Sequence, residues 1–421
     1  MDKVLITGGR KLKGEVEISG AKNSALPIMA ATLLSEEEST LENVPDLRDI
    51  HTMVKLLRTL GARVSFESGV VSIRPGKNLK PIAPYKLVST MRASVCVLGP
   101  LLGRLGHAEV SLPWGCVIGP RPIDLHIKGL QALGAHTEIQ HGYVSARAKR
   151  KLKGADIYLG GAYGSSVLAT GNVMMAATMA QGTTIIENAA CEPEVVDLAR
   201  FLKKMGAKIS GEGSPRLQIE GVKRLHGAQY AIIPDRIEAG TFLFASAMTG
   251  GDVMIKKVEA AHQGAVLDKL GQAGAKILKG KNWIRIRRTG KLKPVDVTTL
   301  PFPGFPTDLQ AQMMALMAIT PGISVITEKI YPDRFMHVSE LNRMGSQIFL
   351  EGSSAIVHGV KRLSGAPVMA SDLRASAALI IAGLVAEGTT ELHRVYHLDR
   401  GYERLEEKFF SIGASIHRER E

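Results

Sequence analysis

The sequence predicts an α/β protein made of six repeated units that divide into three plus three. Three observations predict this fold class. A short glycine-containing phrase recurs at a nearly constant spacing, an apolar helix precedes each copy, and the chain of 421 residues exceeds the usual size of one hydrophobic core. A fixed period of this size is typical of a repeated structural unit, so equivalent loops should carry equivalent functional residues.

The recurring phrase places a glycine, followed in most copies by alanine, between an apolar run and a short β-prone run. Its glycines lie 68 to 73 residues apart and are Gly61, Gly134, Gly206, Gly274, Gly345 and Gly413. A glycine that follows the last turn of a helix takes the left-handed conformation that helix ends favour. Each copy is therefore predicted to be the end of a helix followed by a strand.

The second shared element is an apolar helix of small residues that ends in a turn and leads into a strand. These helices are predicted at residues 24–34, 93–102, 172–181, 241–248, 309–319 and 374–387. Helices with so few charges are expected to be buried on most sides, so that sheets surround helices, the reverse of a TIM barrel. A hinge is expected near Pro234. Residues 22–233 would then form the first domain, and residues 1–21 with 234–421 the second.

Composition narrows the class of partner. The net charge of +13 favours anionic partners, either nucleic acid or phosphorylated metabolites. The aromatic share of 5% argues against nucleic acid, because single-stranded binders stack bases on aromatic rings. Three cysteines, Cys96, Cys116 and Cys191, make no disulfide framework or zinc pattern and suit a cytoplasmic location. The longest apolar stretches are too short to span a membrane.

Polar and basic residues gather where the predicted helices begin. Unpaired backbone N–H groups and the positive end of the helix dipole bind phosphate and carboxylate groups there. Three threonines are interpreted as N-caps: Thr90, Thr170 and Thr307. Four cations are not explained by capping: Lys22, Arg92, Arg236 and Arg374. A positive charge at this end is mildly unfavourable unless an anion is present, so these cations predict an anionic ligand.

Three further features are open to two interpretations. Cys116 lies in a loop whose glycines and prolines exclude regular structure. A loop cysteine beside a cation such as Arg121 can act as an acid or nucleophile, but most loop cysteines are incidental. Arg400 is either a ligand-binding residue or an ordinary surface arginine. The glycine-rich stretch 160–166 could cradle a phosphate, although it matches neither a Walker A loop nor a dinucleotide fingerprint.

Five motifs in order resemble the enolpyruvyl transferases that act on UDP-N-acetylglucosamine in bacterial peptidoglycan synthesis. They are Lys22-Asn23, the Cys116 loop ending in Arg121-Pro122, and residues 305–308, 372–376 and 399–404. The resemblance covers almost the whole chain, residues 4 to 416. It implies a two-domain inside-out α/β barrel with six βαβαββ-type repeats, three in each domain. It also implies that phosphoenolpyruvate and UDP-N-acetylglucosamine give the 3-O-enolpyruvyl sugar nucleotide and phosphate, through a tetrahedral intermediate and without a metal or organic cofactor.

The resemblance also implies residue roles. Cys116 would protonate the enolpyruvyl methylene carbon, form a covalent adduct with phosphoenolpyruvate and be alkylated by the epoxide antibiotic fosfomycin. Asp308 would take the proton of the sugar 3-hydroxyl. The expected substrate-binding residues are Lys22, Arg121 and Arg400 for phosphoenolpyruvate, Asn23 and Arg92 for both substrates, Asp372 and Arg374 in support, and Arg121, Pro122, Ile123, Asp124, Leu125 and Ile330 for the sugar nucleotide. Neither a membrane, nucleic acid nor an oligomer is implied.

Two alternatives stay open. The sister enzyme that transfers the same group to shikimate 3-phosphate would share the fold, but the Cys116 loop favours the sugar-nucleotide branch. A non-catalytic basic protein that binds RNA or another anionic polymer would show strongly salt-dependent binding and would release no phosphate from phosphoenolpyruvate.

Overall fold

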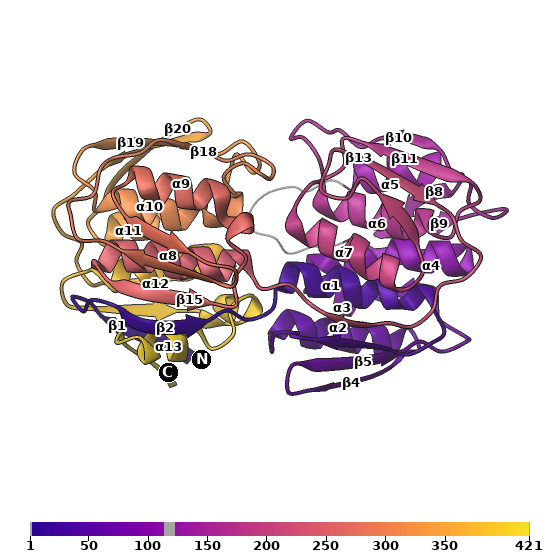
Figure 1. The fold of residues 1–421 in the computed structure, drawn as a ribbon, viewed down its shortest axis with the longest axis horizontal. Helices are drawn as coiled ribbons and strands as arrows, with labels where there is room; N and C mark the ends of the chain where they lie inside the picture. The colour runs from indigo at the N-terminus through magenta and orange to yellow at the C-terminus, as the bar shows by residue number, and fades with distance from the viewer. Residues whose placement is uncertain (1, 113–122, 421) are drawn as a thin grey trace. The chain divides into compact units, whose positions relative to one another are not determined.

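A computed structural model describes residues 2–112 and 123–420 (Figure 1). Its contacts divide the described chain into two compact units. Unit 1 contains residues 2–19 and 234–420, and unit 2 contains residues 20–112 and 123–233. Each unit has a hydrophobic core of its own, so each is described by itself.

Unit 2 holds three four-stranded sheets among its described residues. In their spatial order, the strands of these sheets are β14 (Gln229–Ala231), β3 (Ser39–Glu42), β5 (Val70–Arg74) and β4 (Arg63–Glu67); β6 (Ile82–Ala83), β7 (His107–Ser111), β9 (Tyr143–Arg147) and β8 (His136–Gln140); and β10 (Asp156–Tyr158), β11 (Thr183–Glu187), β13 (Arg216–Glu220) and β12 (Lys208–Ser210).

The described residues of unit 1 likewise form three four-stranded sheets. Their strands are, in the same order, β2 (Lys13–Glu17), β15 (Asp252–Lys256), β17 (Trp283–Arg287) and β16 (Lys276–Lys279); β18 (Val297–Thr298), β19 (Ile323–Thr327), β21 (Ser354–His358) and β20 (Gln347–Glu351); and β22 (Pro367–Met369), β23 (Thr389–His393), β1 (Asp2–Thr7) and β24 (Ser415–Arg420).

All six sheets share one pairing pattern. The first two strands of each sheet run parallel, and the remaining two pairings are antiparallel. In unit 1, for example, β2 pairs with β15 from Lys13 opposite Asp252 to Glu17 opposite Lys256. The pattern confirms the six predicted repeats and their three-plus-three division.

The helices follow the chain between these strands. Unit 2 contains α1 (Lys22–Ala31), η1 (Thr32–Leu34), α2 (Arg48–Thr59), α3 (Tyr85–Val88), η2 (Arg92–Val97), α4 (Leu98–Leu105), α5 (Asp124–Ala132), α6 (Val167–Ala177) and α7 (Pro193–Lys204). Unit 1 contains α8 (Arg236–Thr249), η3 (Ala260–Gln263), α9 (Gly264–Gln272), η4 (Thr307–Leu309), α10 (Gln310–Ala318), α11 (His337–Arg343), α12 (Leu373–Gly383), η5 (Val395–Arg400) and α13 (Leu405–Ser411).

The apolar helices are the most buried elements, as the sequence predicts. Every residue of α10 is buried, and α12 is buried from Arg374 to its end. In unit 1, α8, α10 and α12 lie between the sheets, and in unit 2 the same is true of α1, α4 and α6 (Figure 1). Sheets therefore surround helices within each unit, which confirms the predicted inside-out α/β fold class.

The six recurring glycines end helices as predicted. Each has a positive φ, from +90° at Gly345 to +104° at Gly61, a conformation that side chains other than glycine rarely adopt. Each lies between a helix, α2, α5, α7, α9, α11 or α13, and the strand that follows it. In each unit, these glycines therefore mark the positions of three helix–strand connections.

Several predicted helix ranges are wrong in detail. The helix expected at 241–248 begins at Arg236, and the helix expected at 374–387 ends at Gly383. The helix expected at 172–181 runs instead from Val167 to Ala177, because Ser166 caps it by accepting a hydrogen bond from the Ala169 N–H. The range 93–102 divides into η2 and α4, with Leu98 as the first residue of the α-helix. This start leaves Pro100 in the first turn, where its missing N–H removes no helical hydrogen bond.

None of the helices in the described residues has the length and apolar character needed to cross a lipid bilayer.

Candidate functional site

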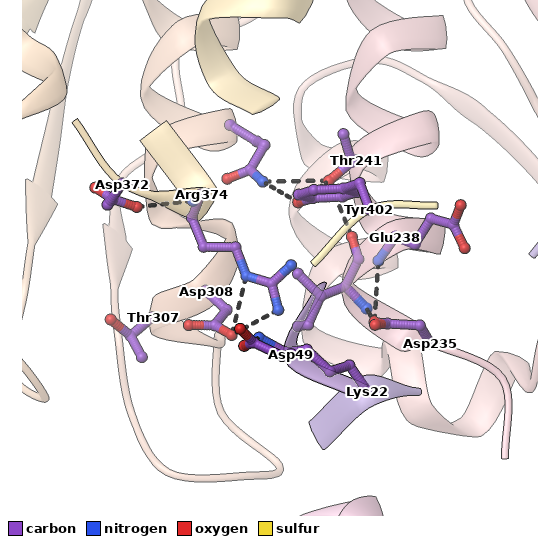
Figure 2. A network of polar contacts seen from close by, with 12 residues as sticks. Lys22, Asp49, Asp235, Glu238, Thr241, Thr307, Asp308, Asp372, Arg374 and Tyr402 are labelled. Atoms are coloured by element: carbon purple, nitrogen blue, oxygen red, sulfur yellow. Dashed lines mark hydrogen bonds and ion pairs between the residues drawn. The ribbon is translucent and has the colours of Figure 1, made fainter. Parts of the chain in front are cut away.

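Two arginine side chains, Arg334 and Arg374, contact Asp308 in unit 1, and Figure 2 shows the contact of Arg374. Asp308 belongs to η4, directly before α10. Arg334 Nη1 donates to Asp308 Oδ1 at 2.8 Å, while Arg374 donates to Oδ2 from Nε at 3.1 Å and from Nη2 at 3.0 Å. The side chains of Arg334 and Arg374 are 7% and 2% exposed, compared with 26% for Asp308. One partly exposed carboxylate is thus held by two buried guanidinium groups.

The start of α12 explains the position of Arg374. Asp372 is the N-cap of this helix, and its Oδ1 accepts hydrogen bonds from the backbone N–H groups of Arg374 and Ala375. The Arg374 guanidinium also lies 5.3 Å from the centre of the Tyr402 ring, a cation–π distance. The Tyr402 hydroxyl in turn contacts Thr241 Oγ1 at 3.0 Å (Figure 2). Arg374 is therefore held both at its backbone N–H and at its guanidinium group.

The charges of this cluster are strongly coupled. Burial raises the pKa of Asp308, but the charges of Arg374 and Arg334 outweigh burial and hold that pKa well below its usual range. Burial lowers the pKa of Arg334, and Asp308 and Asp372 more than reverse that shift. Two guanidinium groups and two carboxylates, Asp308 and Asp372, therefore balance one another. An anionic ligand at this point has to compete with the protein's own carboxylates.

Unit 2 pairs its helix-start cation in the same way. Lys22, the first residue of α1, donates to Asp49 Oδ2 on α2 at 2.9 Å (Figure 2). Both side chains are buried, at 8% and 5% exposure. For Lys22 and Arg374 the anion inferred from the sequence is thus a carboxylate of the protein, which corrects the argument that these cations by themselves require a ligand.

A neutral network occupies the core of unit 2. Asn172 on α6 accepts a hydrogen bond from Gly99 N at 2.8 Å and donates to Val95 O at 2.9 Å. Its Nδ2 also lies 2.9 Å from His126 Nδ1 on α5. Because an amide nitrogen only donates, this nitrogen of His126 is the acceptor. Burial, and secondarily the charge of Arg92, lowers the pKa of His126 to about 3, so the ring is neutral.

The three predicted threonine caps are wrong. Thr90 donates to Leu87 O, Thr170 lies inside α6 and accepts from Ala190 N, and Thr307 is the first residue of η4, where it donates to Glu328. Side-chain capping bonds are made instead at α6, α8 and α12, by Ser166, Asp235 and Asp372. Asn172 likewise lies within α6 and not at a helix start.

The other expected site residues are distributed over both units. In unit 2, Asn23 is half-buried in α1, Arg92 is half-buried at the start of η2, Ile123 is the buried residue before α5, Asp124 is exposed and Leu125 is half-buried. In unit 1, Ile330 is half-buried after β19 and Arg400 is half-buried at the end of η5. Cys116, Arg121 and Pro122 lie outside the described residues.

The two described cysteines do not behave as reactive thiols. Burial raises the pKa of Cys96 to about 12, and burial and the neighbouring Glu192 raise the pKa of Cys191. The thiolate is the nucleophilic form, so both side chains stay protonated and inert at neutral pH. Among the described residues, no group of three or more His, Cys, Asp or Glu side chains is placed to hold a metal ion.

Sequence reasoning missed two residues of the site. Arg334 holds Asp308, and Glu328 is a fully buried carboxylate that accepts a hydrogen bond from Thr307. The available signal was weak: an acidic residue ends a strand, and a Pro-Asp-Arg turn follows four residues later. Nothing in that pattern indicates that Arg334 folds back onto Asp308.

Comparison with known proteins shows the family and the fold to which this chain is similar. The model of the EPSP synthase (3-phosphoshikimate 1-carboxyvinyltransferase) family matches residues 6–409. Among solved structures, the enolpyruvyl transferase NikO from Streptomyces tendae superposes with a TM-score of 0.88 at 25% identity, over 99% of this chain and 98% of that one. The fold is therefore that of the enolpyruvyl transferases.

Two curated relatives indicate the branch of this family to which the chain is similar in sequence. The UDP-N-acetylglucosamine 1-carboxyvinyltransferase of Methylacidiphilum infernorum (isolate V4) is 58% identical, over 99% of each chain. That of Nitratidesulfovibrio vulgaris (strain DP4) is 57% identical, over 100% of each chain. The chain belongs to the EPSP synthase family and, within it, to the UDP-N-acetylglucosamine 1-carboxyvinyltransferases. This finding confirms the resemblance stated from the sequence motifs.

Proposed function

We propose that this chain transfers the enolpyruvyl group of phosphoenolpyruvate to the 3-hydroxyl of UDP-N-acetylglucosamine and releases phosphate, the first committed step of peptidoglycan synthesis. The observation that carries the proposal is the 58% identity to a curated enzyme of that name over 99% of both chains. We also propose that units 1 and 2 are the two domains of the enzyme, and that it works in the cytoplasm without a metal or organic cofactor.

The proposed reaction has two steps. In the first, the sugar oxygen bonds to C2 of phosphoenolpyruvate, Asp308 takes the hydroxyl proton and Cys116 gives a proton to C3. In the second, a base takes a proton from C3, the C2–C3 double bond reforms, and the C2–O bond to phosphate breaks so that phosphate leaves with its electron pair. Lys22, Arg121 and Arg400 would hold the phosphate and carboxylate, because Arg binds such groups bidentately and Lys as a point charge. Fixed cations of this kind stabilise the charge that develops during addition.

The ion pairs of Asp308 bear on its proposed role as a base. The two arginines keep Asp308 ionised at neutral pH, but they also make it a weak proton acceptor. An anionic substrate that shares the guanidinium donors would draw part of their charge away from Asp308. The pKa of Asp308 would then rise toward its ordinary value, so that substrate binding itself prepares the base.

The remaining expected residues are proposed to position the substrates. Asn23 and Arg92 would orient both substrates, and Asp372 would act through the helix start that carries Arg374. Ile330 and the segment of Arg121, Pro122, Ile123, Asp124 and Leu125 would contact the sugar nucleotide.

Phosphate release tests the function. The purified protein is incubated with phosphoenolpyruvate and either UDP-N-acetylglucosamine or shikimate 3-phosphate, and free phosphate is measured. We expect release with the sugar nucleotide alone. Release with shikimate 3-phosphate alone would assign the chain to the sister reaction. If neither acceptor gives release and the protein binds RNA with steep salt dependence, the non-catalytic alternative is correct.

Substitution of Cys116 tests the proposed proton donor. Cys116→Ala and Cys116→Ser are expected to abolish most turnover, and a near-normal steady-state rate would exclude the role. Fosfomycin is expected to label Cys116, as located by peptide mass spectrometry. Cys96 and Cys191 serve as internal controls, because their raised pKa values predict no label at either position.

A further inference from the structure

Glu328 is a buried carboxylate that the proposed reaction does not use. It lies just after β19 and is 0% exposed. Its Oε1 accepts hydrogen bonds from Thr299 Oγ1 at 2.6 Å, Ile330 N at 2.8 Å and Tyr331 N at 3.0 Å. Its Oε2 accepts from Thr307 Oγ1 at 2.9 Å. Four donors from three separate segments of unit 1 therefore converge on one side chain.

A buried charge is costly unless its hydrogen-bonding capacity is filled. An ionised carboxylate accepts about four hydrogen bonds and donates none, so four converging donors match it and a glutamine would not. No ion pair involves Glu328 within the described part of the chain. The carboxylate is thus stabilised by dipoles alone, and its contacts serve to hold those donors in place.

One of these donors leads directly to the candidate site. Thr307 Oγ1 gives its single proton to Glu328, so its lone pairs are available to accept. Arg334 Nη1 donates to that oxygen at 3.0 Å and, with the same nitrogen, to Asp308 Oδ1 at 2.8 Å. Glu328 thereby fixes which way the Thr307 hydroxyl points, and the hydroxyl fixes Arg334 against Asp308.

A second route reaches Arg334 through the backbone. Glu328 holds the Tyr331 N–H, and the Tyr331 carbonyl accepts from the Arg334 N–H at 2.9 Å. The Arg334 guanidinium also lies 5.9 Å from the centre of the Tyr331 ring. Glu328 therefore holds two groups in place: the turn that carries Arg334, and Thr307, whose hydroxyl accepts a hydrogen bond from Arg334.

We propose that Glu328 is a positioning residue that sets the orientation of Asp308 through Thr307 and Arg334. This inference rests on the proposed function, since it assigns Glu328 to the placement of the proposed base. Glu328 would not touch substrate. It would keep the Asp308 carboxylate aimed in one direction, because Arg334 holds one oxygen and Arg374 the other.

Two substitutions separate this role from a general loss of structure. Thr307→Val removes the hydroxyl, keeps the volume and leaves the other three donors to Glu328 in place. Glu328→Gln keeps an oxygen for those three donors but turns an N–H₂ group toward Thr307, whose own proton then loses its acceptor. Both variants are expected to lower kcat on the order of 10²-fold, a typical cost of misplacing a reacting group by about 1 Å, with little change in KM for the sugar nucleotide.

Three comparisons control the experiment. Thr307→Ser keeps the hydroxyl and should recover most of the loss. Thr327→Val makes the same substitution beside Glu328, where the hydroxyl contacts Ser354 instead, and should leave kcat within about twofold. The double variant of Glu328→Gln and Thr307→Val should be no slower than the slower single variant, because both changes break the same connection.

The pH dependence of kcat distinguishes a positioning role of Glu328 from a purely structural one, because a purely structural role would not shift it. A looser Arg334 raises the pKa of Asp308 from its depressed value, and Asp308 must be ionised to accept a proton. The acid limb of kcat should therefore move to higher pH in Thr307→Val and Glu328→Gln, and stay in place in Thr327→Val. An unmoved limb together with a normal kcat in Thr307→Val would overturn the proposal.

Crystal structures of the wild type and Thr307→Val decide the question without activity. We expect Arg334 Nη1 to leave hydrogen-bonding distance of Asp308 Oδ1 in the variant, and an unchanged contact would overturn the proposal. If the wild type releases no phosphate with UDP-N-acetylglucosamine, the proposed function fails, and the crystallographic comparison still decides the positioning role.

Discussion

The two units share one backbone plan but differ in the polar groups at their centres. In unit 1, helix α12 begins with the capping Asp372 and places Arg374 on Asp308, so that the centre is a cluster of full charges. In unit 2, helix α6 begins with the capping Ser166 and places Asn172 on His126, so that this helix carries a neutral amide–imidazole pair, and a buried ion pair of the unit, Lys22 with Asp49, lies at α1. The repeat therefore determines where a helix lies, and individual side chains determine whether that place carries charge.

The difference has an energetic basis. Charges buried in unit 1 are tolerated because each carboxylate has guanidinium or backbone N–H donors. His126 is 1% exposed and has an amide as its partner, so it stays uncharged. Unit 1 should thus respond to removal of a charge mainly in activity, and unit 2 should respond to removal of a hydrogen bond mainly in stability.

The largest expected effect concerns Asp308. Asp308→Asn keeps the shape of the side chain but removes its charge, so we expect turnover to fall by roughly 10²–10⁴-fold, the usual contribution of one acid–base group. Substrate binding should be retained, because the proposed contacts of Lys22 and Arg400 are untouched. Steady-state kinetics measure the effect, and the exposed Asp333→Asn is the matched control. Normal turnover in Asp308→Asn would remove Asp308 as the base.

The next effect is on the stability of unit 2. Asn172→Leu has nearly the same volume but leaves Gly99 N and His126 Nδ1 without the Asn172 amide, whereas Val95 O keeps a hydrogen bond from the Leu98 N–H. We expect the free energy of unfolding to fall by roughly 3 kcal/mol, since each orphaned buried group costs about 1–3 kcal/mol. Denaturant unfolding measures the loss, with the exposed Asn78→Leu as control. Equal stabilities of the two variants would contradict the importance of the network.

A smaller effect follows from the neutral His126. Its folded pKa of about 3 lies below the ordinary histidine value of 6.5, so the unfolded chain takes up a proton that the folded chain does not bind. Stability from this group is present above pH 6.5 and is lost as pH falls toward 3. His126→Asn keeps an acceptor near Nδ1 without titrating. The variant should therefore lose less stability than the wild type between pH 6.5 and 4.5, and parallel curves would disprove the assignment.

Unit 1 should show the opposite slope at Glu238. Burial raises the pKa of this carboxyl to about 7 from its ordinary value of 4.5, although Lys408 opposes the shift. The folded state then holds a proton that the unfolded state has released, so stability falls as pH rises from 4.5 to 7. Glu238→Gln should flatten this part of the stability curve. A steeper fall in the variant than in the wild type would show that the sign is wrong.

The sequence predicts the backbone plan better than the site because the two depend on different distances along the chain. A glycine such as Gly61 ends its helix for a local reason, and an apolar run such as α10 is buried for a reason that its own residues contain. Asp308, in contrast, acquires its properties from Arg334 and Arg374, which are 26 and 66 residues away. No local pattern encodes such a partner.

The failed cap at Thr307 has the same cause. Thr307 is well suited to capping by residue type, but Glu328 and Arg334 offer its hydroxyl both an acceptor and a donor, and these contacts prevail. Lys22 and Arg374 were correctly singled out as unusual cations at helix starts, and the physical argument that they need an anion holds. Asp49 and Asp308 supply that anion from within the same unit.

The path of the chain has a consequence for biosynthesis. Strand β1 is made before the other described strands, yet both of its neighbours, β23 and β24, are made after residue 388. In unit 2, in contrast, all of the described strands have been synthesised once residue 231 has been translated. Unit 2 can therefore mature while translation continues. Strand β2 can pair once β15 has been made, but β1 must remain unpaired until β23 follows residue 388, a period in which chaperones would protect its exposed edges.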